Sequence, residues 1–319
     1  MKKVCSKNQI HAKKFDRQKL LLVIVIICIG TIASLINKSF LKISNITNIF
    51  QSIAVLGIIT MAQTMLIIMG CNDLSYGGVI GLVSCTVCKL ATETDMNICL
   101  VILISLVVGT ICGIINGIIV SYSGCVPLIV TLGLQYVYYG ITLIIVRGNI
   151  MVADNKLSMF TDVKLFGLPL LLYVFAIVVI CTFILLNYTR YGRRIVAIGG
   201  NEVNAFLSGI HHKFYKMLNY SYGGFLVAIA TVMLIARTNA VTANSGDGYA
   251  LRAMAAAIIG GVSFSGGKGT IGGAFLGCIL MGVIANAMNV IGLSGYYQTT
   301  VLGVIIVVSV VFSNLKNKK

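Results

Sequence analysis

The sequence predicts an all-α polytopic membrane protein with about ten membrane-spanning segments in two repeated halves. Of its 319 residues, 58% are hydrophobic and only 10% are charged, whereas soluble domains carry about 25% charged residues. Apolar runs of about 20 residues, long enough to cross a hydrocarbon core, recur along the whole chain. Short motifs in the first half of the chain also return in the second half.

The first predicted helix follows a basic tail, residues 1–19, and the tail contains a single acid, Asp16. The apolar run after it is longer than a signal-peptide core and lacks a small-residue cleavage site, so we expect an uncleaved helix. The C-terminal tail, residues 316–319, is also basic. Because basic ends favour the cytoplasm, both termini are expected there, with an even number of crossings through a membrane domain of residues 20–315.

Ten apolar segments are expected between the tails. They lie at residues 20–37, 48–70, 73–90, 98–121, 126–146, 166–187, 213–236, 250–263, 270–292 and 296–314. The third and eighth are short and contain glycine, so we expect broken or re-entrant segments that are packed in protein.

An internal repeat supports two related halves. GTICGIING at 109–117 matches GTIGGAFLG at 269–277, and IVTLG at 129–133 parallels TTVLG at 299–303. Duplicated halves with interrupted helices are common in transporters, with the substrate route between them. Glycines four residues apart also allow close helix packing, which is the favoured role for each individual glycine.

Several other motifs do not indicate catalysis, metal binding or nucleic-acid binding. GGVSFSGGKGT at 260–270 is not a phosphate-binding loop, because Val262 replaces the required first glycine and Gly269 the required hydroxyl residue. Cys85 and Cys88 have no second pair nearby, so no metal site is predicted. The net charge of +16 has no soluble domain to present it to nucleic acid. We therefore expect a transport protein rather than an enzyme.

The loop at 189–210 is expected in the cytoplasm. It is basic at one end, with a predicted turn at Gly199 and Gly200 and Asn201 as the N-cap of a short helix. That helix would present apolar side chains, Phe206 among them, on one side. Exposed apolar residues favour a docked partner over a plain solvated connection. A partner ATPase would also supply energy, since Asp73 is the only acid clearly within the apolar half-segments and ion-coupled carriers usually embed more.

The chain resembles the permease subunit of the ribose-type monosaccharide ABC importers over roughly residues 45–312. The matching stretches are NDLSYGG at 72–78, NG at 116–117, PLIVTLG at 127–133, TRYGRRIVAIGGNEVNAFLSGI at 189–210, GYALRAMAAAIIGGVSFSGGKGTIGG at 248–273 and SGYYQ at 294–298. In this family GGVSFSGGKG is the loop between the eighth and ninth segments.

The resemblance implies import of a monosaccharide such as ribose, or of a related polar solute, across a bacterial plasma (inner) membrane. It implies a second permease subunit, identical or paralogous, and an extracellular or periplasmic solute-binding protein. It also implies an ABC ATPase that carries ATP and Mg²⁺ and docks on a coupling loop at about 189–212. No cofactor is expected on this chain, and membrane lipid is the remaining partner. The alternatives are a permease for branched-chain amino acids or nucleosides and, from another class, an ion-coupled secondary transporter or channel.

Two departures from the family pattern favour a solute other than ribose or a complementary second permease. Where the family has G-I-D and E-L-D, the chain has Cys71-Asn72-Asp73 and Ala250-Leu251-Arg252, so two acids are lost and a cation is gained.

Two sets of site residues are predicted. The residues expected to couple to the ATPase are Arg190, Gly192, Arg193, Gly199, Gly200, Asn201, Glu202 and Phe206. Those expected along the path or gate are Asp73, Ser75, Asn116, Gln135, Arg252, Asn286, Asn289 and Gln298. Hydrogen bonding between helices is the alternative role for the amide residues in the path set. We expect Asp73 and Arg252, which start equivalent short segments, either to pair across the pseudo-twofold axis or to reach water separately.

Overall fold

The computed structural model describes residues 2–147, 150–294, 297–301, 303–305, 307, 308 and 311, with side chains from Lys19 onward. Within these residues the chain is almost entirely helical, and seven helices are long and apolar enough to cross a membrane. The predicted all-α polytopic fold is confirmed.

The helices follow one another with short connections. Their bounds are α1 (Lys2–Ile36), α2 (Ile43–Ile68), α3 (Tyr76–Glu93), α4 (Ile98–Ser123), α5 (Pro127–Val146), α6 (Met159–Asp162), α7 (Leu170–Tyr188), α8 (Arg190–Gly200), α9 (Glu202–Leu207), α10 (His212–Thr238), α11 (Tyr249–Ile259) and α12 (Ile271–Ile291), with a 3₁₀ turn η1 (Lys38–Leu41). Two antiparallel pairs of short strands complete the chain. They are β1 (Met151–Val152) with β4 (Ala240–Val241) and β2 (Lys164–Leu165) with β3 (Leu168–Pro169).

Local sequence signals explain many helix boundaries. Asn97, Thr189 and Thr270 each accept a backbone hydrogen bond at the N-terminus of α4, α8 and α12 respectively, which satisfies amides that the first helical turn leaves free. Pro127 occupies the first turn of α5, where no amide donor is needed. Gly124 ends α4 in the left-handed conformation.

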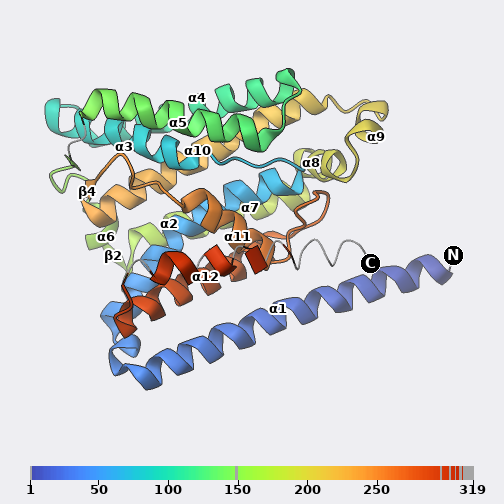
Figure 1. Ribbon diagram of the computed structural model, residues 1–319, viewed down its shortest axis with the longest axis horizontal. Coiled ribbons are helices and arrows are strands. Elements are labelled where there is room, and N and C mark those ends of the chain that lie inside the picture. The colour runs from blue at the N-terminus through green and yellow to red at the C-terminus, as the bar shows by residue number, and fades with distance from the viewer. Residues whose placement is uncertain are drawn as a thin grey trace.

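The long helices lie side by side, and the two ends of the bundle differ (Figure 1). Helices α8 and α9 and the 260–270 loop lie at one end, called the α9 end, together with the start of α1. The paired strands β1 and β4 lie at the other end, called the strand end. Helix α2 forms the centre, with 89% of its apolar window buried, whereas only 11% of the window of α1 is buried. The core therefore surrounds α2, and apolar faces of the outer helices are left for lipid or partner subunits.

Nine of the ten predicted segments coincide with helices. The tenth, 296–314, is described in part, and its described residues are helical, whereas the basic tail at 316–319 lies outside the described residues. Helix α1 already begins at Lys2, so the predicted N-terminal tail is helical and continuous with the first segment.

The third and eighth segments are broken, as expected. Residues 69–75 run without regular helix from the end of α2 into the bundle, where α3 begins. Residues 242–248 run inward from β4, and the 11-residue helix α11 then continues toward the α9 end. The two segments are thus built in the same order, irregular backbone followed by helix, and run in opposite directions (Figure 1).

The repeated glycines serve close packing. A Cβ on Gly113 of α4 would lie 2.4 Å from the Tyr220 carbonyl oxygen of α10, and one on Gly277 of α12 would lie 2.0 Å from the Ala256 carbonyl oxygen of α11. Each glycine therefore allows two helix backbones to touch. The two repeats use different partner helices, α10 for α4 and α11 for α12.

Candidate functional site

The irregular stretch 69–75 is stabilised by side chains from surrounding helices. The Tyr220 hydroxyl of α10 donates to the Asn72 carbonyl oxygen at 2.8 Å, and the Leu74 amide donates to the Thr131 hydroxyl of α5 at 3.0 Å. Irregular backbone is tolerated within a membrane only when its polar groups are satisfied in this way. The start of α3 is therefore fixed by α5 and α10.

Asp73 lies at the centre of a buried hydrogen-bond network. Its Oδ1 accepts from the Ser75 amide at 2.8 Å and from the Ser75 hydroxyl at 2.6 Å. Its Oδ2 accepts from Asn116 Nδ2 of α4 at 2.9 Å. The Tyr138 hydroxyl of α5 then donates to Asn116 Oδ1 at 2.7 Å. Three of the predicted path residues, Asp73, Ser75 and Asn116, thus come together, and they brace α3 against α4 and α5.

The two broken segments touch at glycines. A Cβ on Gly246 would lie 2.2 Å from the Gly77 carbonyl oxygen, so the 242–248 stretch packs directly on the first turn of α3. A Cβ on Gly77 would in turn lie 3.0 Å from Nε2 of Gln135 and 3.1 Å from the Gly246 carbonyl oxygen. The first turn of α3 therefore packs against both α5 and the second broken segment at Gly77.

A pocket of about 310 Å³ opens at this junction, between α5 and the 242–248 stretch. Its lining residues are Gln135, Tyr136, Tyr139, Asn244, Asp247 and Gly248. Only Gln135 was among the predicted path residues. The other lining residues also have a local sequence signal, since QYVYY interrupts the apolar run of α5 and the polar run TANSGDG precedes α11.

Arg252 lies beside the pocket and not beside Asp73. Its guanidinium carbon is 5.7 Å from the centre of the Tyr249 ring, and a Cβ on Gly248 would lie 3.5 Å from its Nε. Among the described residues, ion pairs join Glu202 with Lys216 and His212, and Lys89 with Glu93. The two charges that we expected to pair across the pseudo-twofold axis therefore do not pair in this structure.

The remaining predicted path residues connect helices. Asn45 and Asn286 exchange hydrogen bonds at 3.0 Å between α2 and α12. The Gln298 amide donates to Asn289 Oδ1 at 2.7 Å. Within the described residues, these contacts correspond to the alternative role, hydrogen bonding between helices.

The loop at 189–210 forms two short helices at the α9 end. Asn201 caps α9, because its Oδ1 accepts from the Asn204 amide at 2.9 Å. Val203, Phe206 and Leu207 are 66%, 60% and 76% exposed. The predicted cap and the exposed apolar side chains are thus present, but the predicted turn at Gly199 and Gly200 is wrong. Helix α8 continues through Gly200, and the chain bends at Asn201.

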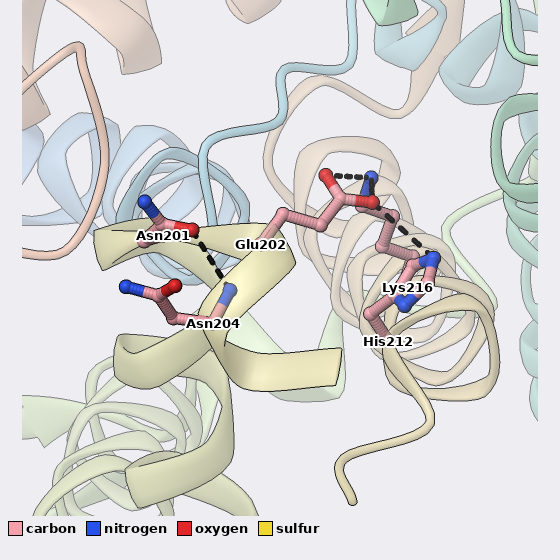
Figure 2. A network of polar contacts seen from close by, with 5 residues as sticks. All are labelled: Asn201, Glu202, Asn204, His212 and Lys216. Carbon is pink, nitrogen blue, oxygen red and sulfur yellow. Dashed lines mark hydrogen bonds and ion pairs between the residues drawn. The ribbon is translucent and has the colours of Figure 1, made fainter. Parts of the chain in front are cut away.

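Glu202 fixes α9 on the start of α10 (Figure 2). Both of its carboxylate oxygens accept from Lys216 Nζ at 2.7 Å, and His212 Nε2 lies 3.4 Å from Oε1. The basic residues of α8 have a different surrounding. Arg190 and Arg193 are exposed, and the Arg194 guanidinium contacts the Tyr215 hydroxyl. Gly192 is buried where α8 starts, and a Cβ there would lie 2.0 Å from the Leu186 carbonyl oxygen.

A glycine junction joins this loop to the membrane core, and we define it as Gly70, Gly199, Gly266 and Gly267. A Cβ on Gly199 would lie 1.9 Å from the Ile68 carbonyl oxygen and 2.7 Å from the Gly267 nitrogen. The Gly267 amide donates to the Ile68 carbonyl oxygen at 2.7 Å. Gly70, Gly266 and Gly267 also have positive φ angles, which favour glycine. The glycine-rich stretch at 260–270 is therefore a backbone contact between α2, α8 and the loop before α12.

Within the described residues, no group of three or more His, Cys, Asp or Glu side chains is arranged to hold a metal ion.

Comparison with known proteins places these features in a family. Residues 45–310 match the family model described as branched-chain amino acid transport system / permease component. The ribose import permease protein RbsC of Bacillus subtilis (strain 168) is 33% identical over 289 residues, which cover 90% of this chain and 89% of the relative. The D-allose transport system permease protein AlsC of Escherichia coli (strain K12) is 33% identical over 296 residues, covering 92% and 91%. The galactose/methyl galactoside import permease protein MglC of Salmonella typhimurium is 33% identical over 299 residues, covering 88% and 89%. No solved structure matches the chain.

Proposed function

The chain belongs to the branched-chain amino acid transport system / permease component family, and from that premise we propose that it is the membrane permease of an ATP-driven importer for a monosaccharide. The observation that carries the proposal is the pair of broken segments, which meet at Gly77 and Gly246 beside a polar pocket. Broken helices that meet between repeated halves are a recurrent way to build a solute path. The relatives named as ribose, allose and galactose permeases indicate the class of solute.

The orientation follows from charge. The α9 end carries Arg190, Arg193, Arg194, Lys213 and Lys216, with Glu202 as the acid of the same loop. Because basic residues favour the cytoplasmic side, this end faces the cytoplasm of a bacterial plasma (inner) membrane, with both termini on that side. The strand end faces outward, toward a solute-binding protein.

The α9 end has the features of a docking site for an ATPase subunit. Val203, Phe206 and Leu207 form an exposed apolar surface that is rigidly held by the Asn201 cap and the Glu202 ion pairs. Next to it lies a groove of about 340 Å³ that includes Arg194, Phe214 and Tyr215. ATP and Mg²⁺ are then bound on the partner, and this chain carries no cofactor. A second permease, identical or paralogous, completes the membrane part.

The test is uptake in cells that lack their own import of ribose, allose and galactose. The chain is expressed with the ATPase and the solute-binding protein encoded beside it, and accumulation of each labelled sugar is measured. We expect accumulation of at least one sugar that requires this chain and stops when ATP hydrolysis is blocked. Uptake that instead follows a proton or sodium gradient would refute the proposal.

A branched-chain amino-acid importer is the second candidate, because the family model carries that description. Labelled leucine, isoleucine and valine belong in the same uptake experiment. Accumulation of these amino acids without that of any sugar would establish this candidate instead.

A further inference from the structure

The pocket between α5 and the 242–248 stretch differs from the buried network around Asp73 in the hydrogen bonding of its polar side chains. The polar groups of Asp73, Ser75 and Asn116 are already hydrogen-bonded to one another. Within the described residues, no hydrogen bond or ion pair engages the side-chain polar groups that line the pocket, from Gln135, Tyr136, Tyr139, Asn244 and Asp247. The first set therefore holds the framework, and the second set is available to a solute.

The chemistry of the lining fits a hydroxyl-rich ring. The carboxamides of Gln135 and Asn244 each offer a donor and an acceptor, and the Asp247 carboxylate accepts from hydroxyl groups. Tyr136 and Tyr139 add two hydroxyls and two ring faces, which cover the C–H face of a sugar. Such a combination of flat apolar surface and a few placed polar groups is typical of small-molecule sites.

The lining also argues against other solutes. It contains no Leu, Ile, Val or Met side chain that would complement a branched aliphatic chain. No Lys, Arg or His is among the lining residues, and Asp247 repels an anion. Arg252 is close to Gly248 but is not a lining residue, and its guanidinium lies over the Tyr249 ring.

The position of the pocket suits a site on the path. Gly77 and Gly246 bring the first turn of α3 and the 242–248 stretch into contact, and Gln135 lies against the same turn. A relative movement of the two broken segments would therefore change the shape of the pocket at once. The volume of about 310 Å³ is near the lower end of the usual range for small-molecule pockets, about 300–1,000 Å³, and admits one small ring.

We propose that this pocket is a solute-recognition site of the permease itself, which binds a single neutral monosaccharide ring through Gln135, Asn244 and Asp247. The inference rests on the proposed function and adds to it that the membrane subunit discriminates among solutes. A solute-binding protein is then a first selector and the pocket a second one.

The chain contains no tryptophan, so one substitution creates a unique fluorescent reporter. Tyr136 is mostly exposed, and Tyr136→Trp can be accommodated there. The full-length variant is placed in lipid nanodiscs without the solute-binding protein and titrated separately with ribose, allose, galactose, glucuronate and leucine. Tyr188→Trp, an equally exposed tyrosine at the α9 end of α7, is the matched control.

We expect a saturable change in Tyr136→Trp emission with at least one neutral sugar, none with glucuronate or leucine, and none in the control. In the Tyr136→Trp background, Asp247→Asn and Gln135→Leu should each raise the half-saturating sugar concentration about tenfold. The first change replaces a charge-assisted hydrogen bond to the solute by a weaker neutral one, and the second removes a hydrogen bond. Asn187→Leu, which removes an exposed amide on α7, should leave it unchanged.

The same variants are then measured in the uptake experiment. If ATP-driven sugar uptake occurs but the reporter does not respond to any neutral sugar, the pocket assignment is wrong and the proposed function stands. Equal fluorescence responses to sugar and to leucine would also overturn the pocket assignment. If no sugar is taken up at all, the proposed function itself fails.

Discussion

Replacing Gly199 with alanine should uncouple the loop at the α9 end from the membrane core. The added Cβ would lie 1.9 Å from the Ile68 carbonyl oxygen, although ordinary van der Waals contact begins at 3.4 Å. It would also lie 2.7 Å from the Gly267 nitrogen. Both neighbours are backbone atoms, so neither can rotate away as the tip of a flexible side chain does.

The end of α8 must therefore move by more than 1 Å (roughly the shortfall in that contact) away from α2 and the 260–270 loop. Overpacking of this kind costs about 1–3 kcal/mol, which corresponds to about a fivefold to 150-fold change in an equilibrium constant. Because the displaced contact lies between the proposed ATPase-docking helices and both broken segments, we expect sugar uptake to fall at least about fivefold. Membrane insertion should stay normal, since no membrane-spanning helix changes.

The neighbouring residue offers a matched control. A Cβ on Gly200 would meet nothing within 4 Å, and alanine is the better helix former, so Gly200→Ala should transport normally. Uptake is measured together with the amount of each variant in the membrane. Equal uptake by Gly199→Ala and Gly200→Ala at equal expression would refute the role assigned to the glycine junction.

Three further predictions test other contacts. Glu202→Lys should reduce uptake several-fold, because the ion pair of Glu202 with Lys216 orients α9. Protein levels should stay normal, because such an exposed ion pair contributes at most about 1 kcal/mol to stability. Normal uptake would contradict the role assigned to Glu202. Asp73→Asn and Arg252→Ala should each impair uptake. Because the two charges are not paired, the double exchange Asp73→Arg with Arg252→Asp should not restore uptake. Restored uptake would show that the two side chains pair in another conformational state. In a chain freed of its own cysteines, a cysteine at position 135 should react with a water-soluble thiol reagent. A cysteine at position 286, where Asn286 hydrogen-bonds to another helix, should react at least tenfold more slowly. The opposite order of reaction rates would place Asn286 on the path and Gln135 in the helix packing.

The bundle could be predicted from the sequence because hydropathy is a local property. Each apolar run by itself predicts one membrane-spanning helix, and the shortness of the third and eighth runs predicted the breaks before α3 and α11. The cap at Asn201 was equally local, since its partner is the amide of Asn204.

The partners of Asp73 could not be predicted in this way. Its hydrogen bond to Asn116 joins positions 43 residues apart, and no local pattern encodes such a contact. The expected pairing with Arg252 failed for a geometric reason. Equivalent positions in two repeats meet only when both lie near the symmetry axis, and the repeat alignment does not give their distance from it. The turn at Gly199 and Gly200 was misplaced because glycine serves close approach there, with no break in the helix.

The shortness of α11 has a consequence for how the protein is made. Its 11 residues span about 16 Å, roughly half of the hydrocarbon thickness. Its first turn also carries Arg252, a residue type that insertion machinery disfavours. A translocon that inserts segments one after another should therefore not release α11 alone into the lipid. We expect α11 to stay in a polar environment until α12 has been synthesised and packs on α11 through Gly273 and Gly277. Nascent chains that end before α12 should accordingly be substrates for membrane quality-control proteases, even though most of the bundle has already been inserted.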